Sequence, residues 1–81
     1  MRYIYVIINP DTQTKVGEGR AHFINKRTIA DAIRRKVGSN YGKGRTLINQ
    51  RYEHVWELLD RWSHRVLYQV IITENKHAEK A

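Results

Sequence analysis

Tyrosine, lysine and arginine side chains in the first third of this 81-residue chain are of the types that act on phosphodiester bonds. Cleavage of such a bond needs an acid or base to activate water and a cation to stabilise the charged transition state. It usually also needs a divalent metal held by a carboxylate. Tyr5 and Arg27 suit the first two roles. They would act together if residues 3–5, Lys15 with its neighbours to residue 17, and Arg27 converge on one face of a sheet.

Basic side chains concentrate in residues 20–51, where nine lysines and arginines accompany a single acid, Asp31. The remainder of the chain is nearly neutral, so a polyanion is the first partner to expect. If about five of these cations contact duplex phosphates, a plot of log affinity against log salt should have a slope of about −4 to −5. The predicted nucleic-acid contacts are Arg27, Arg34, Arg35, Lys36, Tyr41, Lys43 and Arg45.

Residues 39–45 contain two glycines and no apolar periodicity, which predicts an exposed loop. In one interpretation Lys43 and Arg45 approach phosphates there while Tyr41 stacks on an unpaired base. In the other the loop is simply solvated. A nucleotide-hydrolysing phosphate loop fits poorly, because the glycine spacing is one residue short and no Ser or Thr follows Lys43 to hold magnesium.

The N-terminal segments predict a β-hairpin. Residues 3–8 are β-branched and aromatic with apolar side chains on both faces, which is typical of an internal strand. Pro10 and its Asn and Asp neighbours predict a turn. A weaker strand follows within residues 14–23, where Gly17 and Gly19 indicate a bulge, a close backbone approach or an early end.

Apolar residues at helical spacing predict a first helix that ends at Gly38, with a capping box that starts at Thr28. Within it Asp31 stands four residues from both Arg27 and Arg35, the spacing of helical ion pairs. That arrangement leaves the side chains of Arg34 and Lys36 for a partner.

A second helix is predicted over residues 49–64, because apolar side chains recur there at steps of three and four. Their aromatic members are expected to pack against the sheet. Residues 66–73 return to strand character, and residues 75–81 form a frayed tail or a short C-terminal helix.

These elements predict one basic α+β domain over residues 1–81. Its sheet would have three antiparallel or mixed strands covered by two helices, in the order β-β-α-α-β with a short C-terminal helix. A helix-turn-helix is disfavoured, because about eight to ten residues separate the two predicted helices and the motif needs a turn of about three or four.

The motif residues and this order resemble the GIY-YIG endonuclease superfamily. Tyr3-Ile4-Tyr5 resembles the family's first strand, which ends in a tyrosine. Lys15-Val16-Gly17 resembles the end of its second strand, and Lys26-Arg27 the helix start that contains its arginine. The resemblance implies a metal-dependent DNA endonuclease with Tyr5, Lys15 and Arg27 in its active site.

Two departures accompany the resemblance. Lys15 stands where most members have a second tyrosine, and the family's metal-binding glutamate can be matched only by Glu74 or Glu79. The resemblance implies Glu79 as that carboxylate and Mg²⁺ or Mn²⁺ as its metal. Apart from it no cofactor is evident, the metal ligands are unassigned, and whether the chain is an enzyme stays open.

The composition limits the other classes of function. The chain has no cysteine, and its four histidines lack the spacing of a metal site. Its apolar runs are far shorter than the roughly 20 residues of a membrane span, so we expect a cytoplasmic protein. Three hypotheses remain: a small DNA- or RNA-binding protein, the nuclease, and a virus or mobile-element adaptor or inhibitor that binds a nucleic-acid-processing protein. A ribosomal or RNA-chaperone role is also compatible with the charge. The sequence leaves strandedness and oligomeric state open.

Overall fold

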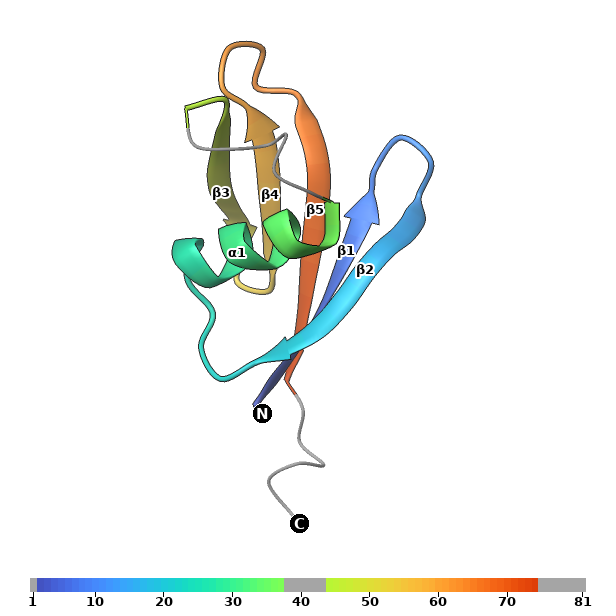
Figure 1. The fold of residues 1–81 in the computed structure, drawn as a ribbon, viewed down its shortest axis with the longest axis vertical. Helices are drawn as coiled ribbons and strands as arrows, with labels where there is room; N and C mark the ends of the chain where they lie inside the picture. Colours follow the sequence, from blue (N-terminus) through green and yellow to red (C-terminus); the bar gives the residue numbers. More distant parts are fainter. Residues whose placement is uncertain (1, 38–43, 75–81) are drawn as a thin grey trace.

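The computed structural model describes residues 2–37 and 44–74, which form five strands and one helix. In chain order these are β1 (Tyr3–Asn9), β2 (Thr14–Ala21), α1 (Lys26–Val37), β3 (Thr46–Tyr52), β4 (Val55–Asp60) and β5 (Val66–Glu74), as Figure 1 shows. The fold combines a sheet with a helix as expected, but the prediction of three strands covered by two helices is wrong. The expected C-terminal helix falls outside the described residues.

The predicted N-terminal hairpin is confirmed, since β1 and β2 pair antiparallel. The side chain of Asn9 forms its turn by accepting a hydrogen bond from the backbone N–H of Asp11 at 3.0 Å. The backbone oxygen of Asn9 accepts a second bond, from Gln13 at 2.7 Å. Asn is well suited to this place because its short amide bonds the local backbone.

The first predicted helix is also confirmed, although its cap lies earlier than the sequence indicated. Asn25 Oδ1 accepts a hydrogen bond from the backbone N–H of Thr28 at 3.0 Å, and Thr28 Oγ1 accepts one from the backbone N–H of Asn25 at 2.9 Å. Asn25 is therefore the N-cap and Thr28 its reciprocal partner in the capping box.

The predicted second helix over residues 49–64 is wrong, because this segment contains the end of β3, all of β4 and the turn after it. The core residues here alternate: Trp56 and Leu58 are buried in the core, with Glu57 between them on the other face. That is the period of a strand. Tyr52 and Trp62, members of the apparent helical stripe, are 63% and 75% exposed.

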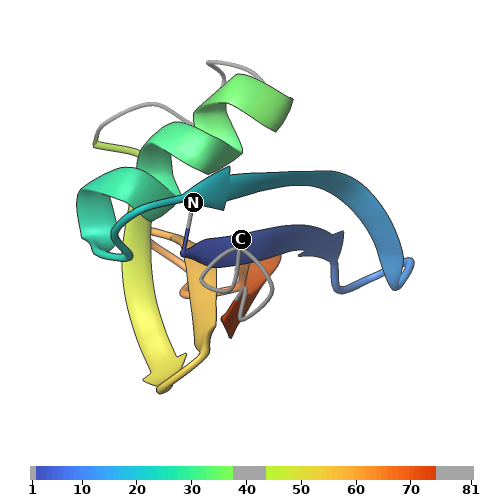
Figure 2. The same ribbon diagram turned by 90° about the horizontal axis from the view of Figure 1, so that it is seen from below.

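The five strands form one antiparallel sheet in the order β2-β1-β5-β4-β3. β1 is internal, as its composition predicted. The sheet is curved, and α1 lies across one face of it, where it contacts both edge strands, β2 and β3 (Figures 1 and 2). The helix is thus fixed at both margins of the sheet.

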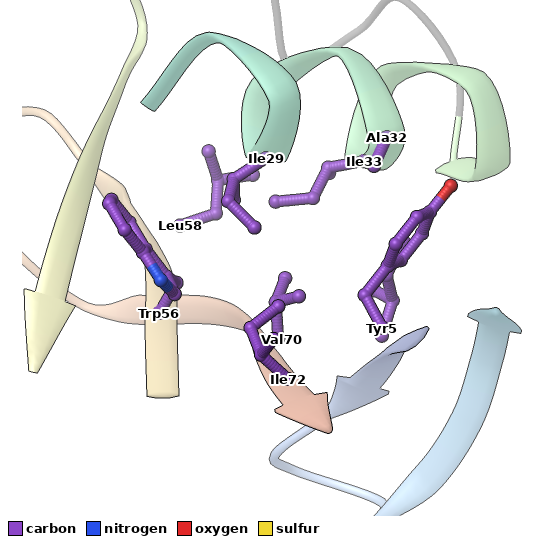
Figure 3. Close-up of a cluster of buried hydrophobic side chains, with 9 residues drawn as sticks. Tyr5, Ile29, Ala32, Ile33, Trp56, Leu58, Val70 and Ile72 are labelled. Atoms are coloured by element: carbon purple, nitrogen blue, oxygen red, sulfur yellow. The ribbon is translucent and has the colours of Figure 1, made fainter. Parts of the chain in front are cut away.

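The core lies between α1 and this face of the sheet (Figure 3). The helix contributes its apolar side, while β1, β4 and β5 contribute alternate residues. The buried set is Tyr5, Ile7, Ile29, Ala32, Ile33, Trp56, Leu58, Val70 and Ile72. Because one face of α1 is committed to this core, its polar side chains are directed outward.

The glycines of β2 allow the close packing on the helix side of the sheet. A β-carbon at Gly19 would overlap the phenol group of Tyr5, and one at Gly17 would lie 2.8 Å from Cγ of Lys36. Two of the three alternatives that the sequence offered for these glycines are confirmed. Gly19 shows the close approach, and the β1–β2 register shifts between Gly17 and Lys15, which is the irregularity of a bulge.

The side chains on the opposite face of the sheet are partly exposed to solvent. Ile4, Val6 and Ile8 of β1 are half-buried.

Glu57 is only 4% exposed, and its carboxylate accepts hydrogen bonds at 3.2 Å from both Asn49 Nδ2 and Arg51 Nη1. A buried carboxylate needs such partners, so this cluster fixes β3 against β4.

Candidate nucleic-acid interface

Two of the predicted catalytic residues, Tyr5 and Lys15, lie apart. Tyr5 is 6% exposed and points from β1 into the core (Figure 3). Lys15 lies three residue pairs further along the β1–β2 ladder, about 10 Å away along the strand, and forms an exposed 3.4 Å ion pair with Glu18. Arg27 lies in the first turn of α1, and Glu79 falls outside the described residues. The described residues therefore do not bring Tyr5 and Lys15 together.

Residues 2–37 and 44–74 contain no group of three or more His, Asp or Glu side chains that could hold a metal ion. The carboxylate that the nuclease hypothesis needs, Glu79, lies beyond them. In the same part of the chain no helix is long and apolar enough to cross a membrane. The nuclease site thus stays a prediction.

A groove of about 720 Å³ runs between α1 and the edge strand β3. Its helix side is formed by Lys26, Arg27, Ala30, Asp31 and Arg34, and its strand side by Thr46, Leu47 and Ile48. The helical residues share one side because positions three and four apart are neighbours on a helix. Three cations and one acid therefore line it, and the groove is basic.

Asp31 is the acid that competes for these cations. Its carboxylate lies 3.9 Å from Arg34 Nη1, and its backbone oxygen accepts a 3.4 Å hydrogen bond from Arg35 Nε. The predicted ion pairs with Arg27 and Arg35 are thus replaced by one with Arg34. Both side chains of the Asp31–Arg34 pair are well exposed, and such a pair contributes only about 0–1 kcal/mol. An anionic ligand can displace it at small cost.

The other predicted contacts divide between different places. Lys36 lies over Gly17 of β2, on the side of α1 away from the groove. Tyr41 and Lys43 fall outside the described residues. Arg45 directly precedes β3, the strand that forms one wall of the groove. Of the predicted contacts, Arg27 and Arg34 thus line the groove, and Arg45 only precedes the strand that lines it. Arg35 is exposed on α1 but is not a lining residue, and Lys36 lies elsewhere.

Arg45 is joined to the turn between β4 and β5. The backbone N–H of Arg61 donates to the carbonyl of Arg45 at 3.0 Å, and Arg61 Nη1 donates to the carbonyl of Gly44 at 3.3 Å. Gly44 has a φ of 91°, a conformation that glycine adopts without strain. These two hydrogen bonds hold Arg61 against the segment that leads into β3.

The same turn presents Trp62, which the sequence had assigned to a helix packed on the sheet. Asp60 Oδ1 accepts backbone hydrogen bonds from Trp62 at 2.9 Å and from Ser63 at 3.1 Å. The Ser63 and Trp62 N–H groups hold the pKa of Asp60 below its ordinary value of 3.8. Asp60 and Ser63 between two largely apolar segments were the available turn signal.

A second hollow, of about 440 Å³, lies at the other end of the sheet. Its lining includes Tyr3, Ile24 and Asn25 together with Glu53 and His54 from the β3–β4 turn region. Trp56 also borders it, and within the described residues its indole N–H is buried without a hydrogen-bond partner. The mixed charge of this hollow makes it a poorer match for a polyanion than the basic groove.

Comparisons of the chain with protein-family models, with curated proteins and with solved structures found no match. The function is therefore inferred from the geometry and charge of the described residues.

Proposed function

We propose that this protein binds nucleic acid through the phosphate backbone, with the groove between α1 and β3 as the contact surface. The observation that carries the proposal is the placement of Lys26, Arg27 and Arg34 along one wall of that groove. Cations held on a rigid element give a polyanion a fixed set of charges to meet, which favours binding without sequence preference.

The anchoring of α1 supports this role. Ile29 and Ile33 are each 1% exposed in the core, so the helix cannot rotate its cations away from the surface. Arginine is suited to phosphate because its planar guanidinium can donate two parallel hydrogen bonds to one anion. Two further exposed cations would extend the contact to about five: Arg35, which is hydrogen-bonded to the backbone of Asp31, and Arg45, which directly precedes β3.

Two double variants test the assignment. Arg27→Gln with Arg34→Gln removes two charges from the groove, whereas Lys15→Gln with Arg20→Gln removes two exposed charges from β2. Affinity for a short DNA duplex is measured by filter binding across a range of salt concentrations. Removal of one phosphate-binding cation should lower the magnitude of the log–log salt slope by about 0.9.

The groove variant should therefore show a slope smaller in magnitude by about 1.8, and the β2 variant should keep the slope of the unmodified protein. Equal reductions in the two variants would show that net charge alone drives binding. In that event the groove is not the interface.

A further inference from the structure

The turn between β4 and β5 places the indole of Trp62 in solvent. Its exposed fraction is 75%, whereas Trp56, the chain's other tryptophan, is 6% exposed in the core. One exposed apolar residue is ordinary on a protein surface. What distinguishes Trp62 is the order of the turn that carries it and the charge beside it.

Hydrogen bonds from residues before and after Trp62 in the chain hold the backbone of this turn. Asp60 accepts the two backbone bonds from Trp62 and Ser63, and its own backbone oxygen accepts a 2.9 Å bond from His64. The N–H of Asp60 donates to the carbonyl of Arg65 at 2.9 Å, which closes the turn. A partner that binds the indole therefore meets a turn that is already ordered, and the entropy cost of binding is reduced.

Arginines surround this turn. Arg61 precedes Trp62 directly and is tied to the backbone of Gly44 and Arg45. Arg65 follows the turn and forms a 2.6 Å ion pair with Asp11. Arg61 is thus the cation next to Trp62 that no carboxylate pairs within the described residues, and its hydrogen bonds connect the turn to Arg45 at the start of β3. That strand lines the basic groove.

We infer that Trp62 is a stacking platform for an unpaired base, and that the protein's nucleic-acid ligand is single-stranded where it meets the β4–β5 turn. The inference rests on the proposed function and adds the class of nucleic acid to it. An aromatic ring beside arginines is the arrangement with which proteins hold single strands, because the ring takes the base and the cations take the phosphates.

Charge favours this occupant over an apolar protein surface. Bases within a duplex are stacked on their neighbours, so their faces are closed to an indole. An unpaired base has a free face, and its phosphates match Arg45 and Arg61. An apolar protein partner would cover Trp62 but would leave these two guanidinium groups without counter-charges.

The test uses a thymidine oligonucleotide and an abasic oligonucleotide of equal length, which carry the same phosphates. Filter binding gives the affinity of the unmodified protein, the Trp62→Ala variant and the Trp62→Phe variant for each oligonucleotide, and tryptophan emission of the unmodified protein reports contact with Trp62. Trp62→Phe is the matched control, since phenylalanine keeps a stacking face. Trp56 stays in place as a buried reference, so no core residue is changed.

We expect the thymidine oligonucleotide, and not the abasic one, to quench Trp62. The Trp62→Ala variant should bind the thymidine oligonucleotide about 5- to 150-fold more weakly and the abasic one unchanged. The Trp62→Phe variant should recover most of that affinity. Equal effects of Trp62→Ala on both ligands, or no effect on either, would overturn the inference and leave the proposed function standing. If neither oligonucleotide binds at low salt, the proposed function fails first.

Discussion

The phenol ring of Tyr5 lies against the backbone of Gly19 so closely that no side chain fits at position 19. The two residues are directly paired across β1 and β2. Tyr5 in turn belongs to the core beneath α1 (Figure 3). Tyr5 can therefore pack beneath α1, the helix that lines the groove, only because position 19 is a glycine.

Replacement of Gly19 by alanine should destabilise the fold by about 1–3 kcal/mol, because the added carbon must displace a ring packed in the core. The free energy of unfolding, measured with urea, gives this value. In a Tyr5→Leu background the clashing phenol atoms are gone, so Gly19→Ala should cost less there. Equal costs in the two backgrounds would contradict the packing described.

Arg51 and Glu57 should be energetically coupled. Arg51→Met leaves the buried Glu57 carboxylate with the hydrogen bond from Asn49, so the variant should have a lower free energy of unfolding. The loss should be modest, because half of the Arg51 side chain is exposed and water can replace it. In a Glu57→Gln background Arg51→Met should cost less, since only the contact of Arg51 with the Tyr52 ring is then lost. The free energy of unfolding in urea is measured for the unmodified protein, the two single variants and the double variant. If Arg51→Met costs the same with and without Glu57→Gln, the two residues are not coupled.

Asp60 should contribute to stability in a pH-dependent way. Its pKa is lowered by backbone hydrogen bonds from Ser63 and Trp62, so the folded state favours the charged carboxylate. A lowered pKa stabilises the fold above the ordinary value of 3.8, and this contribution is lost as pH falls through the folded-state value. The urea midpoint of Asp60→Asn should therefore lie further below that of the unmodified protein at about pH 5 than at about pH 2.5. A difference independent of pH would contradict this role.

Local signals made the first half of the fold predictable. The turn residues after β1 and the apolar spacing of Ile29, Ile33 and Val37 each act within a few residues, and both predictions are confirmed. The segment from residue 48 to 66 misled because a strand, a turn and a second strand happened to space apolar residues by three and four. Its true period depends on which side chains meet α1, and that is a tertiary property.

The candidate interface likewise has features that the sequence predicts and features that depend on tertiary packing. The excess of cations in residues 20–51 was evident from the sequence, and so was their concentration on α1. That Arg34 rather than Arg27 pairs with Asp31, and that β3 supplies the second wall of the groove, depends on how helix and sheet pack. The exposure of Trp62 likewise followed from β4 and β5 being strands.

The salt dependence of nucleic-acid binding by the unmodified protein tests the proposed function most directly. Affinity for a short single strand and for a duplex of equal length is measured by filter binding between about 20 and 300 mM salt. Five phosphate contacts predict linear log–log plots with slopes of about −3.5 for the single strand and about −4.5 for the duplex. Absence of binding at the lowest salt, or affinity that does not change with salt, would contradict the proposed function.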